Sequence, residues 1–264
     1  MKKFLVFLAI FIFIIDCILI TIKLNQNESK RAIHKAKPHY KYSVFLTSDD
    51  GPLKGSRYLD RLIREYQVPF TLFLVGKPFS EDRNLRPYLY NYKSNPYTLL
   101  GNHSFSHASF RYKRYYKNPS NVVRDFFRNR EVLRLDSKFA RLPGRNVWVL
   151  NQTIYKGEPN ALKAAKLLAQ YNYHIFGWDY ELSYKRGKIL QNAYDHYYNI
   201  KKLLIEKKTF TPNQLVVLMH DQLFTKEENI RILENLILLL QDDEEIKLKY
   251  LNQYKVPFSR RAGL

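Results

Sequence analysis

Short apolar runs alternate with longer segments of helical periodicity over most of this chain. Apolar runs typical of buried strands lie at 42–46, 71–75, 97–100, 139–142, 174–176, 215–219 and 248–251. Segments with helical spacing of apolar residues lie between them, at 56–67, 122–136, 161–171, 190–207 and 227–240. Strands that alternate with helices predict an α/β fold with a parallel sheet, either open or closed into a barrel.

The N-terminus has a different pattern, because residues 4–22 are almost wholly apolar and Asp16 is their one charged residue. Each Leu, Ile, Phe or Val there favours insertion by about 0.3 to 0.6 kcal/mol, and together they outweigh the cost of about 3 kcal/mol for one Asp. The run is longer than a typical signal-peptide core, and no small-residue cleavage motif follows it. We therefore expect residues 1–25 to be an uncleaved transmembrane anchor, with a cleaved signal peptide as the alternative.

The composition of the remaining chain indicates one globular domain. Residues 26–40 are polar and basic and should form a linker, and no repeat divides residues 41–264. The net charge of +20 favours a polyanionic partner or a lysine-rich solvated surface. Basic residues interleave with tyrosines, but no zinc-finger, RRM-like or helix-turn-helix pattern supports a nucleic-acid partner, so we expect none. The one cysteine, Cys17, can form no intramolecular disulfide.

Polar side chains follow the predicted strands at the ends where a parallel sheet presents its functional edge. They are Asp49 and Asp50 after the first strand, His103 after the third, Arg141 at the end of the fourth, Trp178 and Asp179 after the fifth, and His220 after the sixth. Each has an ordinary structural explanation when it is taken alone. Their convergence on one edge predicts a single site.

His103 and His107 are four residues apart, so on a helical turn both rings would reach one ion. Two histidines and one carboxylate make a site with open positions that suits Zn²⁺ or a related divalent ion. If Asp50 is the carboxylate ligand, Asp49 stays free as a base toward a water molecule at the ion. Arg141 could then pair with Asp49 and keep it ionised and oriented.

His220 is a candidate proton donor to a leaving amine, because it follows the buried run 215–219. A neighbouring carboxylate, Asp179 or Asp221, could fix its tautomer. The alternatives are that Arg141 forms a surface ion pair, that His220 is a hydrogen-bonded core histidine, and that Asp221 caps a helix.

Five motifs in order resemble those of the NodB-type polysaccharide deacetylases, carbohydrate esterase family 4. They are Thr-Ser-Asp-Asp-Gly at 47–51, Asn-His-Ser-Phe-Ser-His at 102–107, Arg-Leu-Pro-Gly at 141–144, Trp-Asp at 178–179 and Leu-Met-His-Asp at 218–221. The resemblance spans residue 42 to the C-terminus. It implies a distorted (β/α) barrel of about seven parallel strands and a divalent metal, usually zinc, with cobalt and nickel as alternatives.

The resemblance also implies a role for each site residue. Asp49 would be the base, His220 the acid, Arg141 and Asp179 their supports, Asp50, His103 and His107 the metal ligands, and Pro143, Gly144 and Trp178 the substrate and oxyanion contacts. Gly144 stands where a tyrosine is common, so one wall of the groove should lack a ring, and Ser48 replaces the usual Phe. The fourth motif lacks the usual later Asp-Trp, which leaves Asp179, Glu181 and Asp221 as alternative partners of His220.

The implied function is metal-dependent removal of N-acetyl groups from an amino-sugar glycan of the bacterial envelope, such as peptidoglycan or poly-N-acetylglucosamine. The alternatives are a deacetylase or deformylase of a lipid-linked sugar, and a catalytically silent glycan-binding relative. With the anchor, we expect a single-pass protein of the bacterial inner membrane whose domain lies on the periplasmic or extracytoplasmic side. Cleavage of the segment would make the protein secreted.

Overall fold

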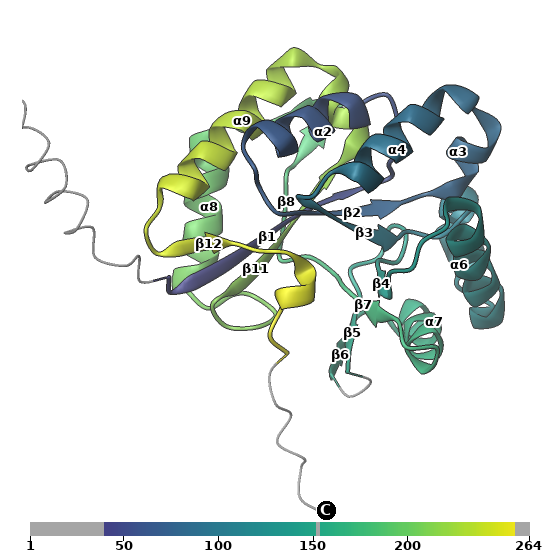
Figure 1. Ribbon diagram of the computed structural model, residues 1–264. Coiled ribbons are helices and arrows are strands. Elements are labelled where there is room, and N and C mark those ends of the chain that lie inside the picture. Colours follow the sequence, from purple (N-terminus) through teal and green to yellow (C-terminus); the bar gives the residue numbers. More distant parts are fainter. Residues whose placement is uncertain (1–39, 152–153, 257–264) are drawn as a thin grey trace, which may run out of the picture. The chain divides into compact units, whose positions relative to one another are not determined.

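The computed structural model describes residues 40–151 and 154–256 of the chain. In these residues one curled sheet packs against helices (Figure 1). Its strand order is β6-β5-β7-β4-β3-β2-β1-β11-β8, and β12 also pairs with β1. Neighbouring strands are parallel except that β5 is antiparallel to both β6 and β7. The expected α/β class with a mainly parallel sheet is confirmed.

The strands of this sheet are short apart from the central two. Their bounds are β1 Tyr42–Asp49, β2 Phe70–Leu74, β3 Thr98–Asn102, β4 Phe139–Ala140, β5 Trp148–Leu150, β6 Ile154–Lys156, β7 His174–Ile175, β8 Tyr180–Glu181, β11 Gln214–His220 and β12 Ile246–Leu248. A separate hairpin joins β9 Tyr184–Lys185 to β10 Lys188–Ile189.

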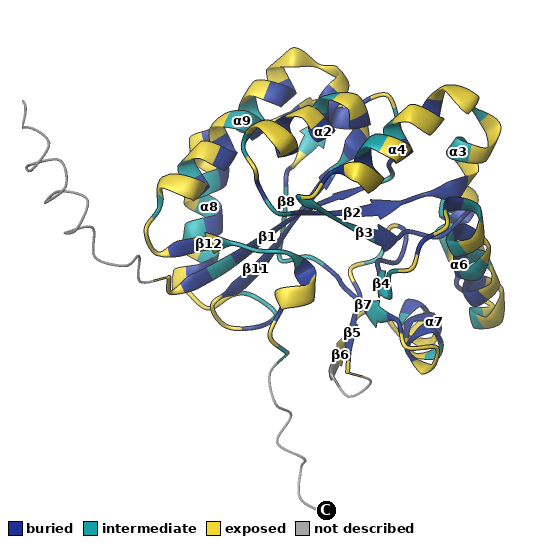
Figure 2. Ribbon diagram, viewed as in Figure 1, coloured by how far each residue is buried: buried dark blue, intermediate teal, exposed yellow. Residues whose placement is uncertain are grey.

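The helices cover the sheet, and the longer ones show one buried side each (Figure 2). Their bounds are α2 Ser56–Glu65, α3 Gly76–Glu81, α4 Arg86–Ser94, α5 Tyr112–Tyr115, α6 Pro119–Leu133, α7 Pro159–Gln170, α8 Ala193–Ile205 and α9 Glu227–Asp242. All five predicted helices are present within a few residues, and α3, α4 and α5 were not predicted. These three are short, so the sequence offers too few turns to establish a helical period.

The central strand β1 has different core partners on its two faces. Val44 and Leu46 belong to a large apolar cluster that includes α2, α8 and α9, whereas Phe45 belongs to a smaller aromatic cluster. Alternate residues of a strand point to opposite faces, so β1 is buried on both. The smaller cluster contains Trp148 and Phe176, whose rings lie 6.0 Å apart. It fills the inner face of the curled sheet.

The sheet is open in the described residues, which corrects the closed form of the expected barrel. The strand order ends at β6 on one side and at β8 on the other. Eight strands of this ten-stranded sheet form parallel pairs, which agrees with the expected number of about seven. The antiparallel β5 and β6 were not predicted. They lie in the region 145–157, where the motifs give no information. The last strand begins at Ile246 instead of residue 248.

Within the described ranges, no helix is both long enough and apolar enough to cross a membrane. The expected anchor at 1–25 lies outside those ranges, as does nearly all of the linker.

Candidate active site

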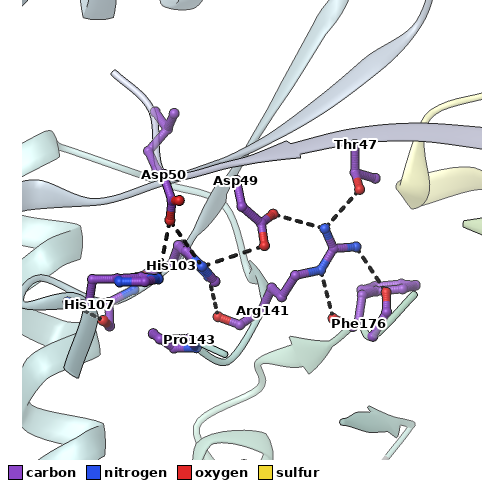
Figure 3. A network of polar contacts seen from close by, with 12 residues as sticks. Thr47, Asp49, Asp50, His103, His107, Arg141, Pro143 and Phe176 are labelled. Atoms are coloured by element: carbon purple, nitrogen blue, oxygen red, sulfur yellow. Dashed lines mark hydrogen bonds and ion pairs between the residues drawn. The ribbon is translucent and has the colours of Figure 1, made fainter. Parts of the chain in front are cut away.

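The two carboxylates at the end of β1 lie in different surroundings. Asp49 ends the strand and is buried, whereas Asp50 begins the next loop and is partly buried. Asp50 has a φ of 76°, in the left-handed region, so the chain direction changes at this residue. Both side chains approach His103, whose Nε2 lies 3.5 Å from Asp49 Oδ2 and 3.7 Å from Asp50 Oδ1 (Figure 3). Their other partners differ, because Asp49 pairs with Arg141 and Asp50 with His107.

Arg141 provides the cation that the buried Asp49 carboxylate needs. Its guanidinium is fully buried, and Nη1 donates to Asp49 Oδ1 and to Thr47 Oγ1, both at 2.8 Å. The other nitrogens donate to main-chain carbonyls, Nε to Phe176 at 3.2 Å and Nη2 to Gly177 at 2.9 Å (Figure 3). A buried charge is tolerated when it is paired and hydrogen-bonded, and both conditions hold here. The structure shows the expected ion pair.

Asp50 forms a compact cluster with the two histidines. Its Oδ1 lies 3.2 Å from His107 Nε2 and 3.7 Å from His103 Nε2 (Figure 3). One possible ligand atom from each residue lies within 4.8 Å of the others. His103 Nδ1 lies 2.9 Å from the carbonyl of Arg141, so this nitrogen donates and Nε2 keeps its lone pair toward Asp50.

A loop brings the two histidines together, and not the helical turn that their spacing suggested. Ser104 and His107 have φ values of 68° and 48°. The N–H of Ser104 donates to Asn102 Oδ1 at 2.9 Å, and the N–H of His107 donates to Ser104 Oγ at 3.1 Å. The ring centroids of His103 and His107 lie 5.1 Å apart as a result. Short polar side chains thus stabilise a backbone that directs both rings to Asp50.

The electrostatics of this cluster fit a divalent cation. Burial, followed by the charge of Asp49, raises the pKa of Asp50 from 3.8 to about 7. Burial lowers the pKa of His103, and it lowers that of His107 from 6.5 to about 3, so both rings stay neutral near pH 7. Asp50 Oδ1 is buried without a hydrogen-bond partner among the described residues. Two neutral imidazoles and one uncompensated carboxylate are suitable ligands for Zn²⁺ and related ions.

A pocket of about 740 Å³ opens beside the cluster. Asp49 and the three cluster residues line it together with His220. Asp49 on β1 and His220 on β11 are register partners, which explains how residues far apart in sequence share one pocket. The volume is in the range of sites for small molecules.

One stretch of the chain matches a known family model. Residues 36–145 match the model of the family described as polysaccharide deacetylase. No curated protein sequence matches the chain.

Solved structures of carbohydrate esterases and deacetylases share the fold of this chain. An esterase of carbohydrate esterase family 4 from Streptococcus mutans is 22% identical, with a TM-score of 0.59 over 80% of this chain and 87% of that one. The catalytic domain of a peptidoglycan N-acetylglucosamine deacetylase from Eubacterium rectale is 18% identical, with a TM-score of 0.57 over 82% and 90%. A family 4 carbohydrate esterase from Streptomyces lividans, solved with acetate, is 19% identical, with a TM-score of 0.55 over 81% and 93%.

Glu181 is an acid in the pocket that interacts electrostatically with His220. Both line the pocket, and the pKa of Glu181 is raised by burial and lowered by the neighbouring His220. The ring of Tyr184 meets His220 edge-on at a centroid distance of 5.3 Å. His220 Nδ1 is buried without a hydrogen-bond partner among the described residues, so no carboxylate fixes its tautomer directly.

Asp179 has structural contacts, which corrects its predicted role as the partner of His220. Its oxygens accept hydrogen bonds from the main-chain N–H groups of Phe210 at 2.6 Å and Val216 at 2.9 Å. Burial raises the pKa of Asp179 to about 6. Asp179 does not line the pocket with His220. Its side chain instead connects the segment before β8 to β11.

Asp221 also faces away from His220. It is buried and accepts hydrogen bonds from Tyr92 and from Ser56 Oγ, both at 2.5 Å, and from the N–H of Leu53 at 3.2 Å. Burial still raises the pKa of Asp221 to about 6. These contacts connect the end of β11 to the loop that follows Asp50.

The predicted substrate contacts divide into two groups. Gly144 and Trp178 line the pocket. Pro143 is buried and does not line it, and its carbonyl accepts a hydrogen bond from the hydroxyl of Tyr116 at 2.7 Å. Beside Gly144, the ring of Tyr112 forms the wall that was expected to lack a ring. No sequence motif includes Tyr112, whose place beside the pocket depends on the loop after His107.

Proposed function

We propose that the chain is a metal-dependent N-deacetylase that acts on an N-acetylated amino-sugar glycan of the bacterial envelope. The observation that carries this proposal is the cluster of Asp50, His103 and His107, which lines one pocket with Asp49 and His220. An acetamido group placed in this pocket would lie near a base, an acid and a cation site. The match of residues 36–145 to the polysaccharide deacetylase family model supports the same reaction class.

Asp50, His103 and His107 would hold the ion, with Zn²⁺ as the first candidate and Co²⁺ or Ni²⁺ as alternatives. When bound, such an ion supplies Lewis-acid polarisation of a carbonyl oxygen. The protein prepares the ligand atoms by keeping both imidazoles neutral and by leaving Asp50 Oδ1 without a hydrogen bond.

Asp49 and His220 would carry out the proton transfers. Arg141 binds Asp49 Oδ1, which leaves Oδ2 to accept a proton from the attacking water. The water oxygen bonds to the acetamido carbon, and the main-chain N–H of Gly144 would stabilise the oxyanion. The C–N bond then breaks while His220 gives a proton to the amine. The products are acetate and a free amino sugar.

Peptidoglycan is the first glycan to test, because the Eubacterium rectale neighbour is a peptidoglycan N-acetylglucosamine deacetylase. The predicted anchor at 1–25 supports a location at the bacterial inner membrane with the domain outside, or secretion if that segment is cleaved. At this surface a lipid-linked sugar is the second candidate substrate.

Metal content and acetate release test the proposal together. The purified full chain should bind about one zinc ion, and Asp50→Ala and His103→Ala variants should bind none. The zinc-loaded wild type should release acetate from peptidoglycan or from N-acetylglucosamine oligomers. A chain that binds zinc and glycan but releases no acyl group from any of these substrates would be a silent relative. A chain that takes up no zinc, cobalt or nickel would contradict the proposed site.

A further inference from the structure

Tyr112 occupies the place in the pocket wall where Gly144 has no side chain. A Cβ atom on Gly144 would lie 2.8 Å from both Cε1 and Cζ of the Tyr112 ring, so a larger residue fits only if the ring moves. Gly144 also has a φ of 60°, which by itself favours glycine. The Tyr112 ring therefore occupies the space that a side chain at position 144 would need, although the two residues lie in separate segments of the chain.

Neighbouring residues hold this ring in position. Tyr112 begins α5, and its ring meets that of His107 edge-on at a centroid distance of 5.9 Å. The guanidinium of Arg145 lies 5.5 Å from the Tyr112 ring centroid and 5.6 Å from that of Tyr116, within the range of cation–π contacts. Arg145 in turn pairs with Glu158 at 3.0 Å. The ring is therefore a fixed part of the wall.

The hydroxyl of Tyr112 is available to a ligand. It has no hydrogen-bond partner in the part of the chain that the structure describes. The carbon that carries it, Cζ, is one of the two ring atoms nearest to Gly144. The other tyrosine in the pocket lining, Tyr184, meets the ring of His220 edge-on at a centroid distance of 5.3 Å. Tyr112 is thus a lining tyrosine with an unengaged donor that lies on the Gly144 side of the pocket.

We propose that Tyr112 contacts the substrate directly, with its ring as the wall against an N-acylated sugar and its hydroxyl as a hydrogen-bond donor to that sugar beside the N–H of Gly144. This inference rests on the proposed function, because the ligand is taken to be an acylamino sugar. Such a sugar offers carbonyl and hydroxyl oxygens that accept from a phenol, and C–H faces that pack on an aromatic ring.

The hydroxyl and the ring can be tested separately. In the zinc-loaded full chain, Tyr112→Phe should lower kcat/KM for acetate release from N-acetylglucosamine oligomers by about three- to tenfold, while zinc content and melting temperature stay unchanged. Tyr112→Ala should lower it further. Tyr90→Phe is the matched control, because Tyr90 is 71% exposed on α4 and should have no effect. An unchanged kcat/KM in Tyr112→Phe would overturn the proposed hydrogen bond.

A double-mutant cycle tests the shared space. Gly144→Ala should reduce kcat/KM more in the wild type than in the Tyr112→Ala variant, because removal of the ring removes the clash. Additive effects would contradict the packing argument.

Calorimetric binding of the same oligomers separates this inference from the proposed function. If the wild type binds them but releases no acetate, the proposed function fails, and weaker binding by Tyr112→Phe still supports the inference. A wild type that neither binds nor hydrolyses them contradicts both.

Discussion

Asp49 and Asp50 are neighbours in the sequence, but the fold compensates their charges in opposite ways. Asp49 is bound by the guanidinium of Arg141 at 2.8 Å inside the protein. In the described part of the chain, the ion-pair contacts of Asp50 Oδ1 are with two neutral imidazoles, and burial followed by the charge of Asp49 raises the pKa of this carboxyl to about 7. The protein therefore completes the site of Asp49 itself and leaves the site of Asp50 to be completed by a bound cation.

At the same sheet edge, the charge of Asp221 is compensated in a third way. Its carboxylate is fully buried like Asp49, but its partners are the neutral donors Tyr92, Ser56 and Leu53 N–H. Neutral donors offset only part of the burial cost, and the pKa stays raised at about 6. The charge of each of these three carboxylates is compensated in a different way. Each is therefore expected to respond differently to substitution.

The largest effect is expected at the two adjacent aspartates. Asp49→Asn and Asp50→Asn should each reduce acetate release by at least about 1000-fold, because one removes the base and the other a ligand. Zinc content separates the two variants. Asp49→Asn should keep the ion and Asp50→Asn should lose it. Loss of zinc in both, or in neither, would break the distinction between the two carboxylates.

Next in size is the effect of removing Arg141. Arg141→Met leaves Asp49 buried without a cation and should lower the free energy of unfolding by about 3 to 5 kcal/mol, measured by urea denaturation. The double variant Asp49→Asn/Arg141→Met removes both charges and should recover part of that loss. A double variant as unstable as Arg141→Met alone would show that packing, and not charge compensation, dominates.

The third prediction concerns the pH dependence of stability at Asp221. Its pKa is raised from 3.8 to about 6 on folding, so the folded state binds the proton more tightly than the unfolded state. The stability from this group is present below pH 4 and is lost as pH rises through 6, by at most about 3 kcal/mol. In urea unfolding measured from pH 4 to 7, Asp221→Asn should reduce this decline. The exposed Asp242→Asn should leave it unchanged, and equal slopes in all three proteins would contradict the argument.

The smallest effect separates Glu181 from Asp179. Glu181→Gln should reduce kcat by about tenfold, because it removes the acid whose charge acts on His220. Asp179→Asn weakens only backbone contacts near β11, so it should lower the melting temperature with little change in kcat. The reverse pattern would restore Asp179 as the partner of His220.

Much of the architecture follows from local sequence patterns. The long apolar run that includes β1 and the amphipathic α9 were predicted within a few residues, because buried strands and core-facing helices repeat at fixed periods. The two-residue strand β8 and the short helices α3 to α5 have no such period. β8 forms through its pairing with β11, which lies far along the chain.

The sequence alone indicated the centre of the candidate site, because polar residues placed directly after buried strands gather at one edge of a parallel sheet. It also suggested the pairing of Arg141 with Asp49. Only the tertiary structure decided which carboxylate is compensated, that Asp179 binds the backbone, and that Tyr112 fills the wall beside Gly144. These outcomes depend on distances between segments tens of residues apart, and such distances are set by packing and by loop conformation, which local patterns do not encode.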